Sequence, residues 1–197
     1  MEKILTLATK NSNKVREIKD ILGGLNFVVR GLDELGDNFG NVSEDAETLE
    51  GNAIIKAWSV WKRIGGWVIA DDSGLFVNSL DGMPGVHSAR YAGEEQNDKA
   101  NNKKLIDELE NKDDKSAFFM TALAIVNPKG GIRVLTGKCE GSITTIPRGE
   151  DGFGYDPLFI PQDYQKTFAQ LGDEEKNKIS HRARALEKLV EFFLERE

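Results

Sequence analysis

Two adjacent carboxylates, Asp71 and Asp72, follow the apolar run VIA within the stretch VIADDSGLF, residues 68–76. A carboxylate at the end of a strand in an open α/β sheet lies where ligands gather, and carboxylate oxygens suit Mg²⁺. Neighbouring side chains of an extended chain point to opposite faces, so both carboxylates can serve one site only if the strand ends there. The alternative is a plain Asp-Ser-Gly turn. The stretch therefore predicts either a magnesium-binding carboxylate or a turn.

A second stretch, ATKNSNK at residues 8–14, lies between an apolar segment and a helical pattern. The first amides of a helix have no partner within the helix, and the positive helix end favours phosphate. Asn11, Ser12 and Asn13 are residue types that cap helices, while Lys10 and Lys14 add positive charge. The stretch predicts a phosphate-binding loop or, alternatively, a well-capped helix with solvent-facing lysines. It lacks the glycine and lysine spacing of the common phosphate loop.

A third stretch, GFGYDP at residues 152–157, combines glycines with aromatic side chains. The glycines permit close approach of the backbone, and Phe153 or Tyr155 could stack on a base. Asp156 precedes a proline and is therefore expected to be extended. The stretch predicts a base-binding turn or, alternatively, a glycine-rich turn with buried aromatic residues.

A fourth stretch, EEKNKISHRARAL at residues 174–186, places cations at the start of a helix. Ser180 is the expected N-cap, so His181 and Arg182 fall in the first turn, where the helix dipole disfavours positive charge. They are either ordinary solvated charges or, together with Lys176, a cluster of donors aimed at a ligand.

The elements that would position these groups alternate along the chain. Apolar patterns predict strands over residues 4–8, 26–30, 67–70, 116–126 and 132–140, and helices over residues 13–22, 47–64, 98–110 and 180–195. The last two strands flank NPKGG, which is typical of a hairpin. The alternation with one hairpin indicates an α/β protein with a mixed β-sheet and flanking helices, formed by residues 1–197 as a single domain.

The composition excludes several classes of protein. The chain has 197 residues and a formal charge of −7, which argues against nucleic acid as a partner. No apolar run approaches the ~20 residues of a membrane span, and the N-terminus lacks a signal sequence, so we expect no membrane partner and a cytoplasmic location. The lone cysteine, Cys139, is expected to be a small hydrophobe near a strand end, and His87 to be structural or exposed.

These stretches together resemble the inosine triphosphate pyrophosphatase family. The likeness covers essentially the whole chain, and the family's order is kept by ATKNSNK, GNAIIKA, ADDSGL with GMPGVHSARY, GFGYDP and EEKNKISHR. The resemblance implies two lobes around a deep substrate cleft, a homodimer and a requirement for Mg²⁺. It also implies hydrolysis of non-canonical purine nucleoside triphosphates (ITP, dITP and XTP) between the α- and β-phosphates, which gives a monophosphate and pyrophosphate.

The resemblance also implies roles for matching residues. Asp72 would be the catalytic base and a metal ligand, and Glu44 the second ligand, with Asp45 and Glu47 as nearby alternatives. A larger set would bind the substrate: the triphosphate by the first loop and Lys56, and the base by the later stretches. Its members are Thr9, Lys10, Asn11, Ser12, Asn13, Lys14, Lys56, Ser73, Phe153, Gly154, Tyr155, Asp156, Lys176, His181 and Arg182.

Two other functions fit the same residues. One is a related septum-associated type of nucleotide pyrophosphatase with another base preference, and the other is a nucleotide-binding module without catalysis. Base selection offers a physical distinction, because inosine and xanthine carry an oxygen at position 6 that accepts hydrogen bonds from buried donors such as Arg182. Sites built on such donors can reject the wrong group by ~10⁴-fold or more.

Overall fold

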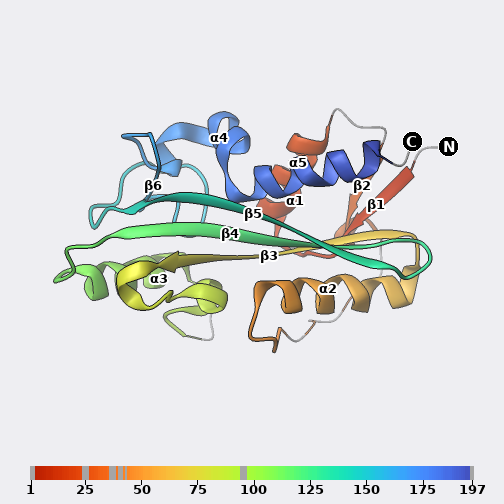
Figure 1. Cartoon of the computed structure of the whole chain (residues 1–197), viewed down its shortest axis with the longest axis horizontal. Coiled ribbons are helices and arrows are strands. Elements are labelled where there is room, and N and C mark those ends of the chain that lie inside the picture. The colour runs from red at the N-terminus through yellow and green to blue at the C-terminus, as the bar shows by residue number, and fades with distance from the viewer. Residues whose placement is uncertain are drawn as a thin grey trace. The chain divides into compact units, whose positions relative to one another are not determined.

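The computed structural model describes residues 3–23, 27–35, 39, 42, 44–93 and 97–195. Its six strands form one sheet in the order β2-β1-β3-β4-β5-β6 (Figure 1). They are β1 (Lys3–Leu7), β2 (Phe27–Gly31), β3 (Trp67–Val77), β4 (Ser116–Val126), β5 (Ile132–Ile143) and β6 (Phe159–Pro161). The α-helices are α1 (Ser12–Leu22), α2 (Leu49–Ile64), α3 (Asp98–Leu109), α4 (Phe168–Ile179) and α5 (His181–Leu194). Because β1 pairs in parallel with β2 and β3, and β6 pairs antiparallel with β5, the predicted mixed sheet is confirmed.

The contacts within the chain define two compact units. Unit 1 consists of Met1–Asp72, Thr121–Gly137 and Arg182–Glu197, and unit 2 of Ser73–Met120 and Lys138–His181. Two of the four boundaries pass through the peptide bonds between Asp72 and Ser73 and between His181 and Arg182. Each unit has a hydrophobic core of its own.

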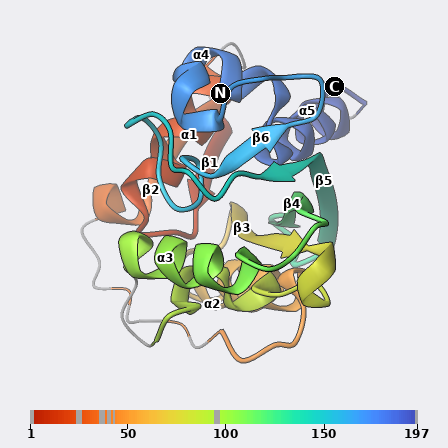
Figure 2. The ribbon, with the colours of Figure 1, turned by 90° about the vertical axis from the view of Figure 1, so that its left-hand side faces the viewer.

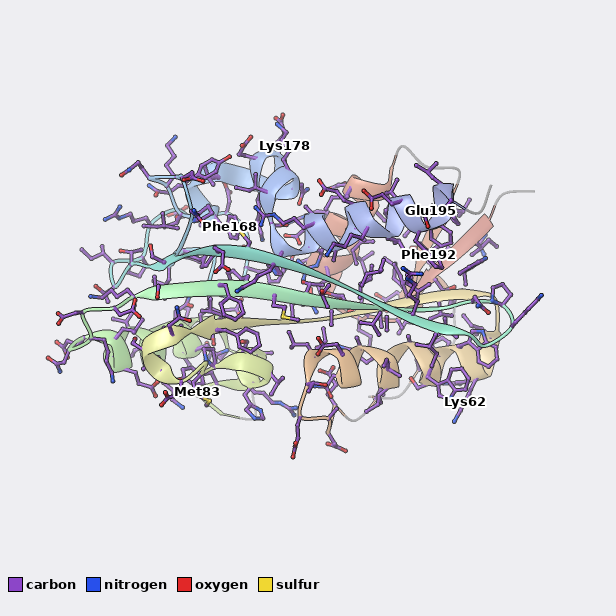
Figure 3. All side chains as sticks on the ribbon, in the orientation of Figure 1. Lys62, Met83, Phe168, Lys178, Phe192 and Glu195 are labelled. Atoms are coloured by element: carbon purple, nitrogen blue, oxygen red, sulfur yellow. The ribbon has the colours of Figure 1, made fainter. Side chains whose placement is uncertain are left out.

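In unit 1, α1 and α5 cover one face of the strands and α2 covers the other (Figure 1). The core on the side of α1 and α5 includes Leu5 and Ile69 from the strands and Leu186 and Leu189 from α5. These α5 residues are three positions apart, so they lie on one face of the helix, as the sequence pattern predicts. The labelled ring of Phe192 points from α5 toward the strands (Figure 3).

In unit 2, α3 and α4 lie on opposite sides of its strand segments (Figure 2). Leu105 and Leu109 of α3 are wholly buried, and they stand four positions apart on one helix face. Phe168 points inward from α4, whereas Lys178 of the same helix points away from the strands (Figure 3). Cys139 is buried on β5, which confirms its expected role as a small hydrophobe.

Most of the predicted elements are confirmed within one to three residues, but three predictions were wrong or incomplete. Strand β3 does not end at Ala70 but runs to Val77, so Asp71 and Asp72 lie inside it. Helix α4 and strand β6 were not predicted, and Gly172 interrupts α4 with a φ of 76°. Asn26, the expected start of the second strand, falls outside the described residues. Within the described part of the chain, no helix combines the length and apolar character that crossing a membrane requires.

Candidate active site

The two carboxylates that follow the apolar run of β3 serve opposite faces of the strand in unit 1. Both are buried, with 2% of Asp71 and 7% of Asp72 exposed. Alternation along the strand sends Asp71 toward α1 and α5 and Asp72 toward α2. The alternative of an Asp-Ser-Gly turn is therefore wrong, and the opposite pairings explain why a strand can carry adjacent charges: each carboxylate contacts cations on its own face of the strand.

Asp71 is bound by cations from two helices. Its Oδ2 lies 3.0 Å from Nζ of Lys14 on α1 and accepts hydrogen bonds from Nη2 and Nε of Arg182 on α5, at 3.0 and 3.2 Å. The Nη1 of Arg182 also pairs with Glu17 of α1. The cation in the first turn of α5 is thus offset by two buried carboxylates, which explains its unfavourable place in the helix dipole.

The electrostatics of this group follow from burial and pairing. Burial alone would raise the pKa of Asp71, but Lys14, Arg182 and Lys56 outweigh it and hold that pKa far below its usual range. Burial lowers the pKa of Lys14, and Asp71 offsets only part of this effect. Burial would also lower the pKa of Arg182, yet Asp71 and Glu17 raise it overall. The group is therefore a fixed ionic cluster.

Asp72 is held from the other side by two residues of α2. Lys56 Nζ lies 2.7 Å from its Oδ1, and Asn52 Nδ2 donates to its Oδ2 at 3.4 Å. Lys56 Nζ also lies 3.5 Å from Oε1 of Glu44. Burial would lower the pKa of Lys56, but Asp72, Asp71 and Glu44 raise it overall. Asn52 and Lys56 reach the same carboxylate because residues four apart share a helix face.

These positions fit a hard cation with few protein ligands. Oxygens of Glu44 and Asp72 lie within reach of a single point, the ammonium nitrogen of Lys56. Among the described residues, no group of three or more His, Cys, Asp or Glu side chains is arranged to hold a metal ion. Two carboxylates suit Mg²⁺, which takes its remaining ligands from water and phosphate. Asp45 and Glu47 are exposed, whereas Glu44 is partly buried and pairs with Lys56.

The loop before α1 is organised by side-chain caps. Asn11 Oδ1 accepts hydrogen bonds from the backbone N–H groups of Asn13 and Lys14 at 3.0 and 3.2 Å, and Thr9 Oγ1 accepts one from the N–H of Asn11. Two of the amides predicted to be unpaired are therefore already satisfied. Lys10 and Ser12 are exposed, and both could contact an anion together with the mostly buried ammonium group of Lys14.

In unit 2, the GFGYDP stretch forms a tight turn around a buried ion pair. Asp156 Oδ2 accepts a hydrogen bond from the N–H of Phe153 at 2.8 Å and lies 2.6 Å from Nζ of Lys176. Gly152 adopts a φ of +78°, and a Cβ at this position would lie 2.1 Å from Asp156 Oδ2. Only glycine allows this approach.

The turn presents one aromatic ring rather than two. Tyr155 is buried, and its hydroxyl donates to the carbonyl oxygen of Ser88 at 2.8 Å, so it is not available to stack on a ligand. Phe153 is partly exposed, and Lys176 Nζ lies 4.6 Å from the centre of its ring. The backbone of Gly154 is held by Asp98 and Asn102 of α3, which sequence reasoning missed.

The predicted donor cluster divides between the units. Lys176 and His181 belong to unit 2, where the His181 ring stacks on Phe119 with centroids 4.6 Å apart, whereas Arg182 belongs to unit 1. Ser73, on β3, is partly buried in unit 2, and the exposed His87 agrees with expectation. Glu17 and Asn52 were also missed, although the spacing of four residues between Asn52 and Lys56 indicates that both lie on one face of the helix.

Removal of the cation in the buried pair of unit 2 should be costly. We expect Lys176→Met to lower the free energy of unfolding by about 3 kcal/mol, because it leaves the Asp156 carboxylate buried without its ammonium partner. Denaturant unfolding measures the effect. Lys178→Met is the matched control, since Lys178 lies on the same helix and its side chain is 58% exposed. Equal stability of the two variants would contradict the importance of the pair.

Comparison with known proteins identifies the family of this chain. The sequence profile of the Ham1 family matches residues 5–192. A dITP/XTP pyrophosphatase of Bacillus licheniformis is 52% identical over 189 residues, which are 95% of this chain and 96% of that protein. A dITP/XTP pyrophosphatase of Bacillus subtilis is 49% identical and covers 93% of each chain. The structure of the Staphylococcus aureus Ham1 protein, 40% identical, has a TM-score of 0.88 and covers 99% of this chain and 100% of its own. The resemblance is confirmed, and the chain belongs to the Ham1 family.

Proposed function

We propose that this protein hydrolyses the non-canonical purine nucleoside triphosphates dITP, ITP and XTP to the monophosphate and pyrophosphate. The dITP/XTP pyrophosphatases of the two Bacillus species, at 52% and 49% identity, support this substrate class. The observation that carries the proposal is the buried Asp72 carboxylate, held by Lys56 beside Glu44. A buried carboxylate with cationic neighbours is an arrangement that suits the activation of a water molecule next to a polyphosphate.

The cations of unit 1 suit a triphosphate, which brings about four negative charges. Lys56 and Lys14 supply two mostly buried ammonium groups, and the exposed Lys10 adds a third positive charge. The N-terminus of α1, with its Asn11 cap, contributes the positive end of the helix dipole. We propose that this group holds the phosphates, so an acidic protein can bind an anionic substrate through local charge.

Asp72 takes the central role in the proposed reaction. Its carboxylate accepts a proton from a water molecule, whose oxygen attacks the α-phosphorus in line with the bond to the β-phosphate. The new P–O bond forms as that bond breaks, and pyrophosphate leaves. Glu44 and Asp72 would hold Mg²⁺, which when bound would neutralise phosphate charge and make a nearby water more acidic. Lys56 would stabilise the charge that develops on the leaving group.

We assign recognition of the base to the residues of the later stretches. The partly exposed ring of Phe153 would stack on the purine, while Lys176 orders the turn through Asp156. His181 of the same unit and backbone amides are the proposed donors to the oxygen at position 6, whereas Arg182, the other donor expected from the sequence, is engaged by Asp71 and Glu17 in unit 1. Adenine carries an amino group at that position and would leave such donors unpaired, which disfavours ATP.

Incubation with Mg²⁺ and separate dITP, XTP, GTP and ATP tests the proposal. We expect pyrophosphate rather than single phosphate as the product, and kcat/KM for dITP and XTP at least about 10²-fold above that for ATP. Release of single phosphate would disprove the bond assignment. Equal rates on all four would favour the septum-associated type with another base preference, and binding of dITP without turnover would favour a non-catalytic module.

Three further features remain proposals that rest on the family resemblance. They are a requirement for Mg²⁺, assembly as a homodimer, and a cytoplasmic location. Dialysis against a chelator followed by restoration of Mg²⁺ checks the first, and sedimentation checks the second.

A further inference from the structure

Asn52 is a buried amide that links two parts of the candidate metal site, and the sequence analysis assigned it no role. Its side chain is on α2 and only 2% of the residue is exposed. Its Oδ1 accepts a hydrogen bond from the N–H of Ala46 at 3.0 Å, and its Nδ2 donates to Asp72 Oδ2 at 3.4 Å. Ala46 lies two positions after Glu44, so one side chain connects the segment that carries Glu44 to the carboxylate of Asp72.

The residue before Asn52 holds the same segment by close packing. A Cβ on Gly51 would lie 2.6 Å from the Cβ of Ala46, a distance that real Cβ atoms do not reach. The N–H of Gly51 also donates to Thr48 Oγ1 at 3.1 Å, which caps α2. Ala46 and Thr48 are thus fixed against the first turn of α2 by a hydrogen bond, a cap and a contact that only glycine permits.

This anchoring determines where two carboxylates stand. Lys56, one turn after Asn52 on the same helix face, contacts both Glu44 and Asp72. Asn52 leaves Oδ1 of Asp72 to Lys56 by binding the other oxygen. The affinity of a cation for two carboxylates depends on how well the protein fixes their separation, and residues that orient ligands typically contribute 10–100-fold.

We propose that Asn52, supported by Gly51, is a positioning residue that sets the separation of the Glu44 and Asp72 carboxylates and thereby the affinity for Mg²⁺. The proposal rests on the metal pair of the proposed function. It predicts that a change at Asn52 alters the affinity for Mg²⁺ more than it alters base selection or the binding of the phosphates.

Asn52→Ala tests the proposal directly. We expect the dissociation constant of Mg²⁺, measured by calorimetry on the substrate-free protein, and the Mg²⁺ concentration for half-maximal hydrolysis of dITP to rise by about 10-fold. The matched control is Asn101→Ala on α3, because Asn101 is also 2% exposed and bridges two backbone groups, the N–H of Ala92 and the carbonyl of Ala89. Both variants lose a buried amide, so a general loss of stability would affect them equally. A Mg²⁺ affinity for Asn52→Ala equal to that of Asn101→Ala would overturn the proposal.

Gly51→Ala tests the same positioning without touching either the amide or the carboxylates. The added methyl group favours the helix but collides with Ala46, so it should displace the Glu44 segment and weaken Mg²⁺ binding by several-fold. Adding Ala46→Gly removes the colliding atom and should restore most of the affinity. An unaltered affinity in Gly51→Ala, or no recovery in the double variant, contradicts the proposal even if Asn52→Ala fails to fold.

The outcomes separate this inference from the proposed function. Hydrolysis of dITP without Mg²⁺ would contradict the assignment of Glu44 and Asp72 as metal ligands, and with it this inference, but would support the proposed hydrolase activity. Binding of Mg²⁺ that depends on Asn52 and Gly51, in a protein that does not hydrolyse dITP, would support this inference and contradict the proposed hydrolase activity.

Discussion

We expect Asp72→Asn to lower kcat for dITP by about 10³-fold or more while the protein remains folded. The amide has the size of the carboxylate and can still accept a hydrogen bond from Lys56, so the packing against α2 is kept. It cannot take a proton from water, and loss of a positioned base costs typically ~10²–10⁴-fold. It is also a poorer ligand for Mg²⁺. Both effects lower turnover.

Pyrophosphate release at saturating dITP and Mg²⁺ measures the change, and thermal unfolding verifies the fold. Asp107→Asn serves as the control, because this aspartate is 59% exposed and pairs with Lys103 one helical turn away. Its turnover should match that of the unmodified protein. Turnover of Asp72→Asn within a few-fold of the control would remove Asp72 from the mechanism.

Asp71→Asn should act on stability rather than directly on chemistry. The change removes the negative charge that Lys14 and Arg182 share, and it leaves two cations close together in a buried cluster. Breaking a buried ion pair in this way costs about 3–5 kcal/mol. We expect the free energy of unfolding at pH 7, measured by denaturant titration, to fall by that amount.

The pH dependence distinguishes this electrostatic cause from a packing defect. The pKa of Asp71 is far below its usual value in the folded protein, so its ionised form stabilises the fold at every pH above the pKa of an unfolded aspartate, about 3.9. This stability is lost as the pH falls below that value. The difference between the two proteins should therefore narrow as the pH falls below about 5. A difference that is independent of pH would contradict the ionic role of Asp71.

The sequence predicted the elements well where local patterns decide them. Apolar spacing located α1, α2, α3 and α5, and β4 was predicted with the bounds it has. Strand β3 was cut short because charged residues ordinarily mark the end of a buried strand. Its continuation depends on cations from α1, α2 and α5, which no local pattern contains. Helix α4 was missed because Gly172 divides its apolar pattern.

The site shows the same limit. The stretches that would bind phosphate, metal and base were found because their residue types suit that chemistry. The partners that hold them were not, since Glu17 and Arg182 are 165 positions apart and Asn102 lies 52 positions from Gly154. Tyr155 was a candidate for stacking only until its burial was known. Residue type predicts a capacity for chemistry, whereas the fold decides which side chains remain accessible to use it.

The alternation of Asp71 and Asp72 on β3 makes the length of this strand matter more than its composition. An insertion or deletion of one residue between Trp67 and Asp72 would exchange the faces of the strand to which the two side chains point. Asp71 would then point toward α2, and Asp72 toward α1 and α5. Conservative replacements of the apolar residues leave each carboxylate on its own face of the strand. Natural or engineered variation in this part of the chain should therefore consist of exchanges at constant length.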